Sequence, residues 1–434
     1  MGPGHLGLQA PCPPDRTDPA GGCQTGPVPV PLWRNRDFLL LWTGQVVSTL
    51  GTRISGLAYP LLVLAVTGSP ARAGLVASAQ AAPFLIWFLP AGALVDRWSR
   101  KRIMLVADAG RAVALASVAV AVVLGRITIG HLMVVAFVEG TLFVFFLLAE
   151  TAALPHVVPK PQLPTAIAQN QARDQGADLA GQPLGGFLFG LGHAVPFAVD
   201  AVSYVVGVAL LAPIRRSLQE QPAPERRHLL AEICEGVRWL WRQHLLRALV
   251  AIASAGNLAF SALGLTIIVR ATDLGASSTA VGVLLGLFGV GAIAGALLAP
   301  PVQCLVAPNV IMLGALWWWV AQMVAFALAP TVFVLGAVYT VGALMGPIFN
   351  TTSAAYRYAL TPDRLQGRVG GVSRMIGWGA RPLGAILGGM SLETLGAVPT
   401  FAALATWLAI VAAASTASRQ IRQAPMPETL TEQP

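Results

Sequence analysis

The sequence predicts an all-α integral membrane protein in which twelve transmembrane helices form two bundles of six. The first observation is composition: of the 434 residues, 55% are hydrophobic and only 11% are charged. Soluble domains carry about 25% charged residues, so this chain falls in the membrane class. The other two observations are the lengths of the apolar runs and the distribution of positive charge between them.

The apolar runs give the number of helices, since a spanning α-helix needs about 20 mostly apolar residues. The fifth run opens with the polar stretch "AQNQARDQGAD", and only Pro330 and Thr331 separate the ninth run from the tenth. The twelve runs lie at roughly 38–66, 73–95, 103–125, 130–152, 165–190, 194–213, 247–269, 279–301, 310–329, 331–356, 369–390 and 396–417.

Positive charge tests this count and sets the orientation. If the N-terminus is inside, 20 of the 28 Lys and Arg residues lie on the cytoplasmic side, against Arg72, Arg126 and Arg270 outside. Cytoplasmic loops of membrane proteins carry such an excess. The basic residues include only two lysines, Lys101 and Lys160, a bias that indicates a GC-rich bacterial genome. We therefore expect a multi-pass protein of the bacterial inner membrane with both termini cytoplasmic.

The longest interior loop, at 214–246, divides the chain. Residues 34–213 then form an N-terminal six-helix bundle and residues 247–417 a C-terminal one, between a disordered tail at 1–33 and a cytoplasmic tail at 418–434. The loop alternates apolar and basic residues near helical spacing, which predicts an amphipathic helix along the inner membrane surface. A solvated linker helix is the alternative.

Short repeats relate the two halves. "GALV" at Gly92 recurs as "GALL" at Gly295, and "PLGG" at Pro183 recurs as "PLGA" at Pro382. The two offsets in sequence are nearly equal. This pattern indicates a duplicated six-helix unit with parallel repeats.

Several classes of protein are excluded. The net charge of +9 does not indicate a nucleic-acid partner, because the arginines sit in short loops between apolar runs. The four cysteines have no paired spacing, so no disulfide framework and no metal site are expected. The chain has no Walker A sequence and no catalytic constellation. We expect a protein that is not an enzyme, needs no cofactor and is driven by an ion gradient. Its expected partners are a small-molecule substrate and membrane lipids, and it is expected to be a monomer.

The loop between the second and third runs, "GALVDRWSRKR", contains a motif: Gly92, Asp96, Arg97, Arg100 and Lys101. With this motif the chain resembles the major facilitator superfamily, and within it the branch that contains enterobactin and macrolide exporters. The resemblance covers roughly 34–417. It also rests on "RNRDFLLLWTGQVVSTLG" at 34–51, "PLLVLAVTGS" at 60–69, "PFAVDAVSYVV" at 196–206 and "TPDRLQGRVGGVSRMIGWGARPLGAILGG" at 361–389.

The resemblance implies that this motif is a cytoplasmic latch, which holds the two halves together when the cavity faces outward. Asp96 would face Arg97, Arg100 or the N-terminus of the eleventh span, since an acid at a cytoplasmic helix end is otherwise unfavourable. Gly92 would let the second span approach a neighbour closely. The alternative is that the cations only anchor the loop inside. Ser99 stands where the family has a glycine.

The fifth span carries "AGQPLGGFLFG", which looks like a displaced version of the proline-glycine signature of exporters in this superfamily. Gln182 interrupts the usual order. Gly181, Gly185 and Gly186 would allow close helix packing, and Pro183 would kink the helix. A packing role and a mechanistic role both remain open.

Charged residues inside the predicted spans need partners, because each costs about 2.5–3.5 kcal/mol if unpaired at the bilayer centre. Asp108 and Arg111 are three residues apart on one helical face, which predicts a structural ion pair. Arg173 and Arg374 lie near cytoplasmic ends and are expected to snorkel.

Four deeper charges have no neighbour in sequence: Arg53, Glu139, Asp178 and Arg381. In the superfamily that the chain resembles, the first, fourth, seventh and tenth spans line the cavity and the second, fifth, eighth and eleventh border it. Glu139 and Asp178 are therefore candidates for proton coupling, with Arg53 and Arg381 as partners that modulate them or hold an anionic substrate. The alternative is that all four belong to structural ion pairs.

Further polar and aromatic side chains lie in the predicted spans. Asn257, Asn350 and Tyr356 would hydrogen-bond either a ligand or a neighbouring helix. Trp317, Trp318 and Trp319 open the ninth span, and we expect all three to face lipid or the interface.

These features predict a secondary active exporter that works by alternating access and proton antiport. Its substrate is expected to be an amphipathic small molecule such as an antibiotic, a macrolide-like drug or a siderophore. An importer on the same fold is one alternative. A membrane sensor or assembly partner that does not transport is the other.

Overall fold

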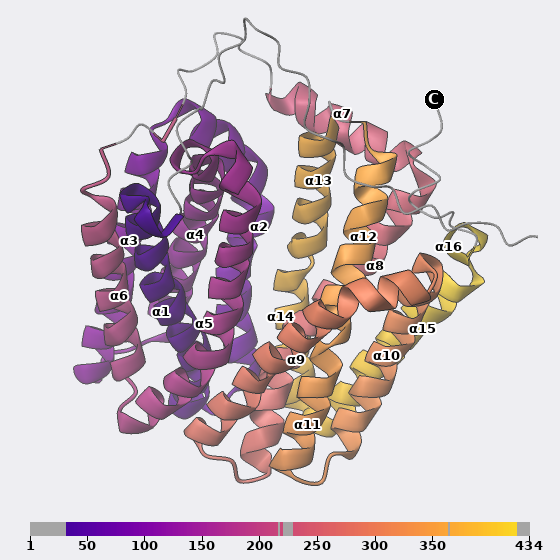
Figure 1. Ribbon diagram of the computed structural model, residues 1–434. Helices are drawn as coiled ribbons and strands as arrows, with labels where there is room; N and C mark the ends of the chain where they lie inside the picture. The colour runs from indigo at the N-terminus through magenta and orange to yellow at the C-terminus, as the bar shows by residue number, and fades with distance from the viewer. Residues whose placement is uncertain (1–31, 216–217, 220–228, 363–364, 423–434) are drawn as a thin grey trace, which may run out of the picture.

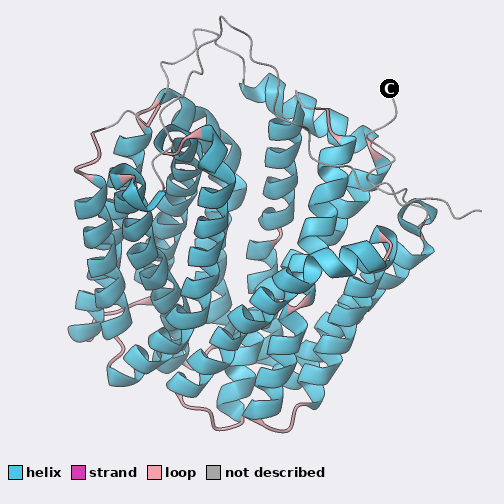
Figure 2. Cartoon of the chain, viewed as in Figure 1, coloured by secondary structure: helices cyan, strands magenta, loops and turns pink. Residues whose placement is uncertain are grey.

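The computed structural model describes residues 32–215, 218–219, 229–362 and 365–422, which form helices and loops with no strand among them (Figure 2). Six helices precede the linker and form the N-terminal half. They are α1 (Arg36–Thr67), α2 (Pro70–Arg97), α3 (Arg100–Val123), α4 (Ile129–Val157), α5 (Leu163–Leu191) and α6 (Val195–Leu211), with short 3-10 turns η1 (Leu32–Arg34) and η2 (Lys160–Gln162).

The C-terminal half follows the linker helix α7 (Leu229–Arg242) and ends before the short helix α16 (Arg419–Arg422). Its helices are α8 (His244–Asp273), α9 (Ser278–Leu305), α10 (Pro308–Leu328), α11 (Val332–Ala343), α12 (Met345–Leu360), α13 (Gln366–Gly379), α14 (Arg381–Leu395) and α15 (Ala397–Ala417).

Polar residues set where many of these helices begin. At six starts a side-chain oxygen accepts a hydrogen bond from the backbone N–H three residues later, which satisfies one of the free donors of the first turn. These N-cap residues are Asn35, Ser69, Ser99, Thr128, Ser277 and Thr331.

The described helices supply twelve spans. Nine segments are long and apolar enough to cross a membrane, and one of them is α11 continued by α12, Val332–Leu360. The other three spans are α5, whose first half is polar, α6, which has 17 residues, and the broken pair of α13 and α14. Two six-helix bundles result, indigo to magenta and pink to yellow in Figure 1.

Two spans that the sequence predicts as continuous are interrupted. The tenth span breaks at Leu344, between α11 and α12, and the eleventh at Ala380, between α13 and α14. A proline follows each break closely, Pro347 and Pro382. Proline has no backbone N–H and its ring clashes with the preceding turn, so it interrupts the helical ladder.

The halves pack together at the end opposite α7 (Figure 1), through α5 with α9 and through α2 with α14. Both contacts rely on glycine: a methyl group on Gly186 would lie 3.1 Å from the Cα of Gly282, and one on Gly74 would lie 3.0 Å from the Cα of Gly389. At the same end, Glu393 of α14 accepts hydrogen bonds from the Ser69 hydroxyl (2.7 Å) and the Ala71 backbone (3.1 Å). The closed end is thus held by helices at equivalent positions of the two halves.

The predicted linker contains the helix α7, and each predicted tail has a short helical segment next to its bundle. α7 packs on α13, where Glu235 pairs with Arg368 and a methyl group on Gly236 would lie 3.2 Å from the Arg368 carbonyl oxygen. Leu32, expected in the disordered tail, is buried in η1, and α16 lies within the expected C-terminal tail. Most of both predicted tails, 1–31 and 423–434, lies outside the described residues.

Candidate functional site

A cavity of about 500 Å³ lies between the two halves. Helices α1, α2 and α5 line it from the N-terminal half, and α8, α9, α11 and α14 from the C-terminal half. A second cavity of about 360 Å³ adjoins it within the C-terminal half. Residues common to the walls of both are Phe260, Gly264, Phe288, Tyr339 and Arg381.

Arg53 and Asp178 form an ion pair in the wall of the larger cavity. The Arg53 Nε lies 2.9 Å from the Asp178 Oδ1, and the two side chains are 39% and 25% exposed, so both are open to the cavity. Close packing of α1 and α5 brings them together: a methyl group on Gly181 would lie 2.5 Å from the Arg53 Cβ, and one on Gly185 would lie 2.7 Å from the Ile54 carbonyl oxygen. Pro183 packs in turn against Gly286 of α9.

Arg381 is the first residue of α14, directly after the break in the eleventh span. Its Nε donates a hydrogen bond to the Asn257 Oδ1 (3.0 Å), and its guanidinium lies 4.8 Å from the ring centroid of Trp378. No carboxylate of the described residues lies within 4 Å of Arg381. The two arginines expected to partner the deep acids therefore differ. Arg53 forms an ion pair with a carboxylate, whereas Arg381 contacts an amide and an aromatic ring.

Aromatic side chains form much of the second cavity. Phe260 and Phe349 each meet Trp319 edge to face, with ring centroids 5.2 and 5.1 Å apart. The expectation that all three tryptophans face outward is wrong for Trp319, which is 6% exposed, whereas Trp317 and Trp318 are 46% and 36% exposed. Consecutive helical residues point about 100° apart, so one of three adjacent side chains turns inward.

Of the three polar residues predicted to hydrogen-bond a ligand or a neighbouring helix, two line a cavity and one does not. Asn257 and Asn350 line the second cavity, while Tyr356 is fully buried and lines neither. Among the residues that the structure describes, no group of three or more His, Cys, Asp or Glu side chains is arranged to hold a metal ion.

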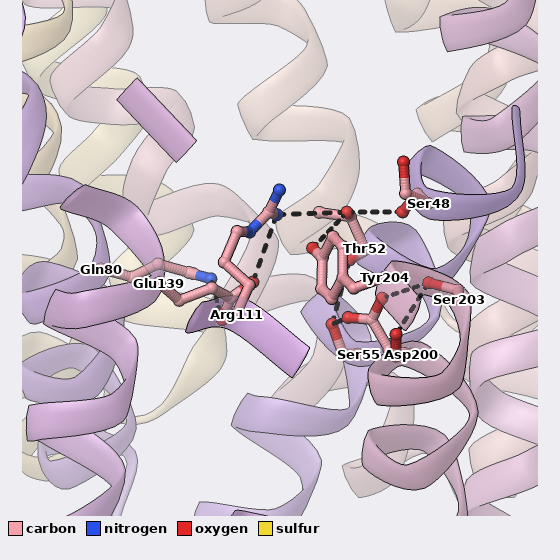
Figure 3. A network of polar contacts seen from close by, with 9 residues as sticks. All are labelled: Ser48, Thr52, Ser55, Gln80, Arg111, Glu139, Asp200, Ser203 and Tyr204. Carbon is pink, nitrogen blue, oxygen red and sulfur yellow. Dashed lines mark hydrogen bonds and ion pairs between the residues drawn. The ribbon is translucent and has the colours of Figure 1, made fainter. Parts of the chain in front are cut away.

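A polar network fills the interior of the N-terminal half (Figure 3). An Arg111 Nη lies 3.7 Å from the Glu139 carboxylate, with the two side chains 4% and 2% exposed. The same guanidinium donates to the Thr52 hydroxyl (3.3 Å) and lies 4.1 Å from the Tyr204 ring centroid. Gln80, which lines the larger cavity, donates to Glu139 at 3.5 Å, so one side chain links cavity and network.

The expected pairing of Asp108 with Arg111 does not form. Arg111 reaches across the bundle to Glu139 on α4 and Tyr204 on α6, and no nitrogen of its guanidinium lies within 4 Å of the Asp108 carboxylate. Asp108 is 1% exposed, and neither of its carboxyl oxygens has a hydrogen-bond partner in the described part of the chain.

Asp200 is a buried acid that the sequence reasoning missed. It lies fully buried on α6 and accepts hydrogen bonds from the Ser55 hydroxyl (2.5 Å) and the Ser203 hydroxyl (3.0 Å), as Figure 3 shows. The signal was a single acid in the otherwise apolar stretch "PFAVDAVSYVV", which we used only for the family resemblance.

The ion pair and hydrogen bonds of the loop motif join it to the N-terminal half and to the first residues of the linker. Asp96 is 75% exposed and lies 3.7 Å from Arg100. Arg100 donates to the carbonyl oxygens of Ala152 and Leu218, and Lys101 donates to those of Ala212 and Ile214.

The two remaining members of the motif make no close helix contact. Arg97 is exposed, and a methyl group on Gly92 would meet nothing within 4 Å. The close approach expected at Gly92 is therefore absent, because in this structure the halves meet at the opposite end. Arg173, expected to snorkel, instead pairs with Glu150 (2.8 Å) and Asp174 (3.0 Å).

Two six-helix bundles around a cavity with buried charges define the class: a multi-pass membrane transporter. The family model described as transmembrane secretion effector matches residues 29–430. The chain belongs to this family and, through it, to the major facilitator superfamily.

Curated relatives carry the name "multidrug efflux pump Tap". The protein from Mycolicibacterium fortuitum is 27% identical over 381 residues, covering 85% of this chain and 92% of the relative. The one from Mycobacterium tuberculosis is 28% identical over 397 residues, covering 86% and 90%.

Solved structures agree on the fold. A mutant of the nucleoside transporter NupG superposes with a TM-score of 0.71 at 15% identity, covering 86% of this chain and 98% of that one. A bacterial homologue of the iron transporter ferroportin, in an inward-facing state, superposes with a TM-score of 0.68 at 14% identity, covering 88% and 99%.

Proposed function

We propose that the chain is a secondary active exporter that moves an amphipathic small molecule across the bacterial cytoplasmic membrane. The observation that carries this proposal is the cavity between the halves, which combines aromatic walls with charged side chains from both halves. The naming of its relatives as multidrug efflux pumps supports export. Antibiotics, macrolide-like drugs and siderophores are candidate substrates of this chemistry.

In this proposal the α7 end is cytoplasmic, as are both termini. The α7 end of the molecule carries a cluster of basic residues, in accord with the positive-inside rule: Arg97, Arg100, Lys101 and Arg102. The glycine contacts then close the outer side, and the exposed Asp96 is a latch residue in its released state. The protein described here is inward-facing on this reading, ready to load substrate from the cytoplasm.

Protons drive the cycle in our proposal, and Asp178 carries the coupling. It faces the cavity and neutralises Arg53, so protonation of Asp178 would break that pair and free α1 to move against α5. Glu139, reached from the cavity through Gln80, is the second coupling acid. The protein acts as a monomer among membrane lipids, with no cofactor and no nucleic-acid partner.

Everted membrane vesicles test this function directly, because uptake into them corresponds to export from cells. Two amphipathic probes are used, the cation ethidium and the anion 2-naphthoate. Vesicles that contain the protein and have an acid interior should accumulate at least one of them, and collapse of the proton gradient should release the accumulated probe. Vesicles without the protein are the control. Gradient-driven loss from the vesicles would indicate an importer instead. Tight binding without flux would indicate a sensor.

A further inference from the structure

We infer that the cavity binds aromatic acids, with the anionic group of the ligand held by Arg381 and its rings packed against the aromatic wall of the C-terminal half. This inference rests on the proposed function, because it names the substrate class of the same cavity. Three independent features of the described residues lead to it: charge balance, free hydrogen-bond donors and the apolar wall.

The charge balance of the cavities is positive. The charged side chains that line them are Arg53, Asp178 and Arg381. Arg53 and Asp178 compensate each other at 2.9 Å, which leaves the guanidinium of Arg381 without a counter-charge. A charge held at membrane depth is costly unless it is paired. An anionic ligand would supply the missing partner.

The donors of Arg381 are arranged for such a ligand. Nε is engaged by Asn257 and one face of the guanidinium lies over Trp378. The terminal nitrogens Nη1 and Nη2 have no acceptor among the described residues, and the side chain lines both cavities. Two parallel N–H groups of a guanidinium match the two oxygens of a carboxylate or sulfonate. Asn257 and Trp378 therefore position the fork while leaving it open.

The wall of the second cavity next to Arg381 can pack against the aromatic rings of a ligand. The second cavity is lined by Phe260, Phe288, Trp319, Tyr339 and Phe349. Trp319 meets Phe260 and Phe349 edge to face, and Phe288 meets Tyr339 at a tilt, and these contacts fix the orientation of the rings. Aromatic pairs prefer such offset or edge-to-face geometry. A ligand with an acidic group at Arg381 would extend its ring system into this volume of about 360 Å³.

Three compounds of nearly equal shape separate charge from hydrophobicity: 2-naphthoate, 2-naphthamide and 2-naphthamidine. Binding to the full chain in lipid nanodiscs is followed by quenching of tryptophan fluorescence, to which Trp319 and Trp378 contribute. We expect the acid to bind about tenfold or more tightly than the amide, as charge-assisted hydrogen bonds imply, and the amidine to bind weakest.

Two variants remove the excess of positive charge in different ways. Arg381→Gln deletes the guanidinium, whereas Asn257→Asp keeps it and places a carboxylate where the Nε acceptor now lies. Both should abolish the preference for the acid over the amide. Arg374→Gln is the matched control, because Arg374 is exposed and lines neither cavity, and it should keep the preference. If Arg381→Gln fails to fold, Asn257→Asp alone decides.

The inference is overturned if the amide or amidine binds as tightly as the acid, or if no member of the series binds. It is also overturned if the acid preference survives in those of the two variants that fold. Vesicle flux reports separately on the proposed function. Gradient-driven ethidium flux without any preference for the acid would remove the inference and leave export standing. A clear acid preference without flux in any assay would retain the ligand class and remove export.

Discussion

At the scale of single residues, the organisation of the N-terminal half depends on how its buried charges are paired. Arg111 and Glu139 are both almost fully buried and face each other at 3.7 Å, while Arg53 and Asp178 pair at the cavity surface. The first pair is enclosed by protein and the second is open to the cavity. We therefore expect the first pair to contribute to stability in addition to the coupling role proposed for Glu139, and the second pair to affect mainly transport.

Asp178→Asn should reduce gradient-driven flux about a hundredfold, the lower end of the range for removal of a positioned proton-transfer group. The amide cannot bind or release a proton, and it leaves Arg53 without a counter-charge. Protein level and folding should stay normal because the side chain is partly exposed. Flux into everted vesicles, normalised to protein, measures the effect, and undiminished flux would remove Asp178 from coupling.

Glu139→Gln and Arg111→Gln should each destabilise the protein by about 3–5 kcal/mol, since either change leaves one uncompensated buried charge. The double variant should cost clearly less than the sum, because it removes both charges together. Unfolding of the purified protein in detergent, read as a double-mutant cycle, measures this coupling. Additive costs would show that the two side chains do not stabilise each other.

The sequence predicted most of the charged residues that lie inside the spans. It did not predict which residues they pair with. Helical spacing favours Asp108 with Arg111, yet the partners of Arg111 are Glu139 and Tyr204, which are far away in sequence. Arg53 and Asp178 had no neighbour in sequence for the same reason. Tertiary packing of helices decides such pairs, and periodicity along one helix carries no information about it.

At the scale of helices, glycine determines where the two halves can meet. Gly186 faces the Ser278 backbone and Gly282, so any larger side chain there would push α5 from α9. Gly176 lies on the same helix with nothing within 4 Å of an added methyl group. The two positions provide a matched pair for testing closure of the end opposite α7.

Gly186→Leu should disfavour closure of the end opposite α7 by about 1–3 kcal/mol, the usual cost of overpacking, and should slow transport accordingly. Gly176→Leu should transport like the parent. Flux into everted vesicles at equal protein level compares the two. Equal flux in all three proteins would mean that approach of α5 to α9 does not limit the cycle.

Run length and charge were sufficient to predict the twelve spans, because membrane thickness sets the length of a span and the positive-inside bias sets the charge of the loops. They did not reveal the breaks at Leu344 and Ala380. Prolines near those points were visible in the sequence, but a proline inside a span can kink a helix as well as break it. The second break matters most, since it places Arg381 at the start of α14.

At the scale of the whole molecule, the proposed function makes the closed end opposite α7 and the exposed Asp96 features of one state of a two-state cycle. Asp96→Asn should leave the stability of this state unchanged, because Asp96 is 75% exposed here. It should weaken the other state, in which the motif joins the halves, by about two- to fivefold in population, as expected for an exposed ion pair. Thermal unfolding and vesicle flux together measure this, and an unaltered flux would leave the motif as an anchor only.

Alternation between two states is the central claim, and distances measured at both ends of one molecule test it most directly. Spin labels at Lys160 and Leu305 report on the α7 end, and labels at Arg126 and Phe333 report on the opposite end; all four positions are exposed. The native cysteines are replaced by serine. Relative to the parent, Gly186→Leu should shift the α7-end pair to shorter distances and the opposite pair to longer ones. Movement of both pairs in the same direction, or of one pair alone, would contradict the account.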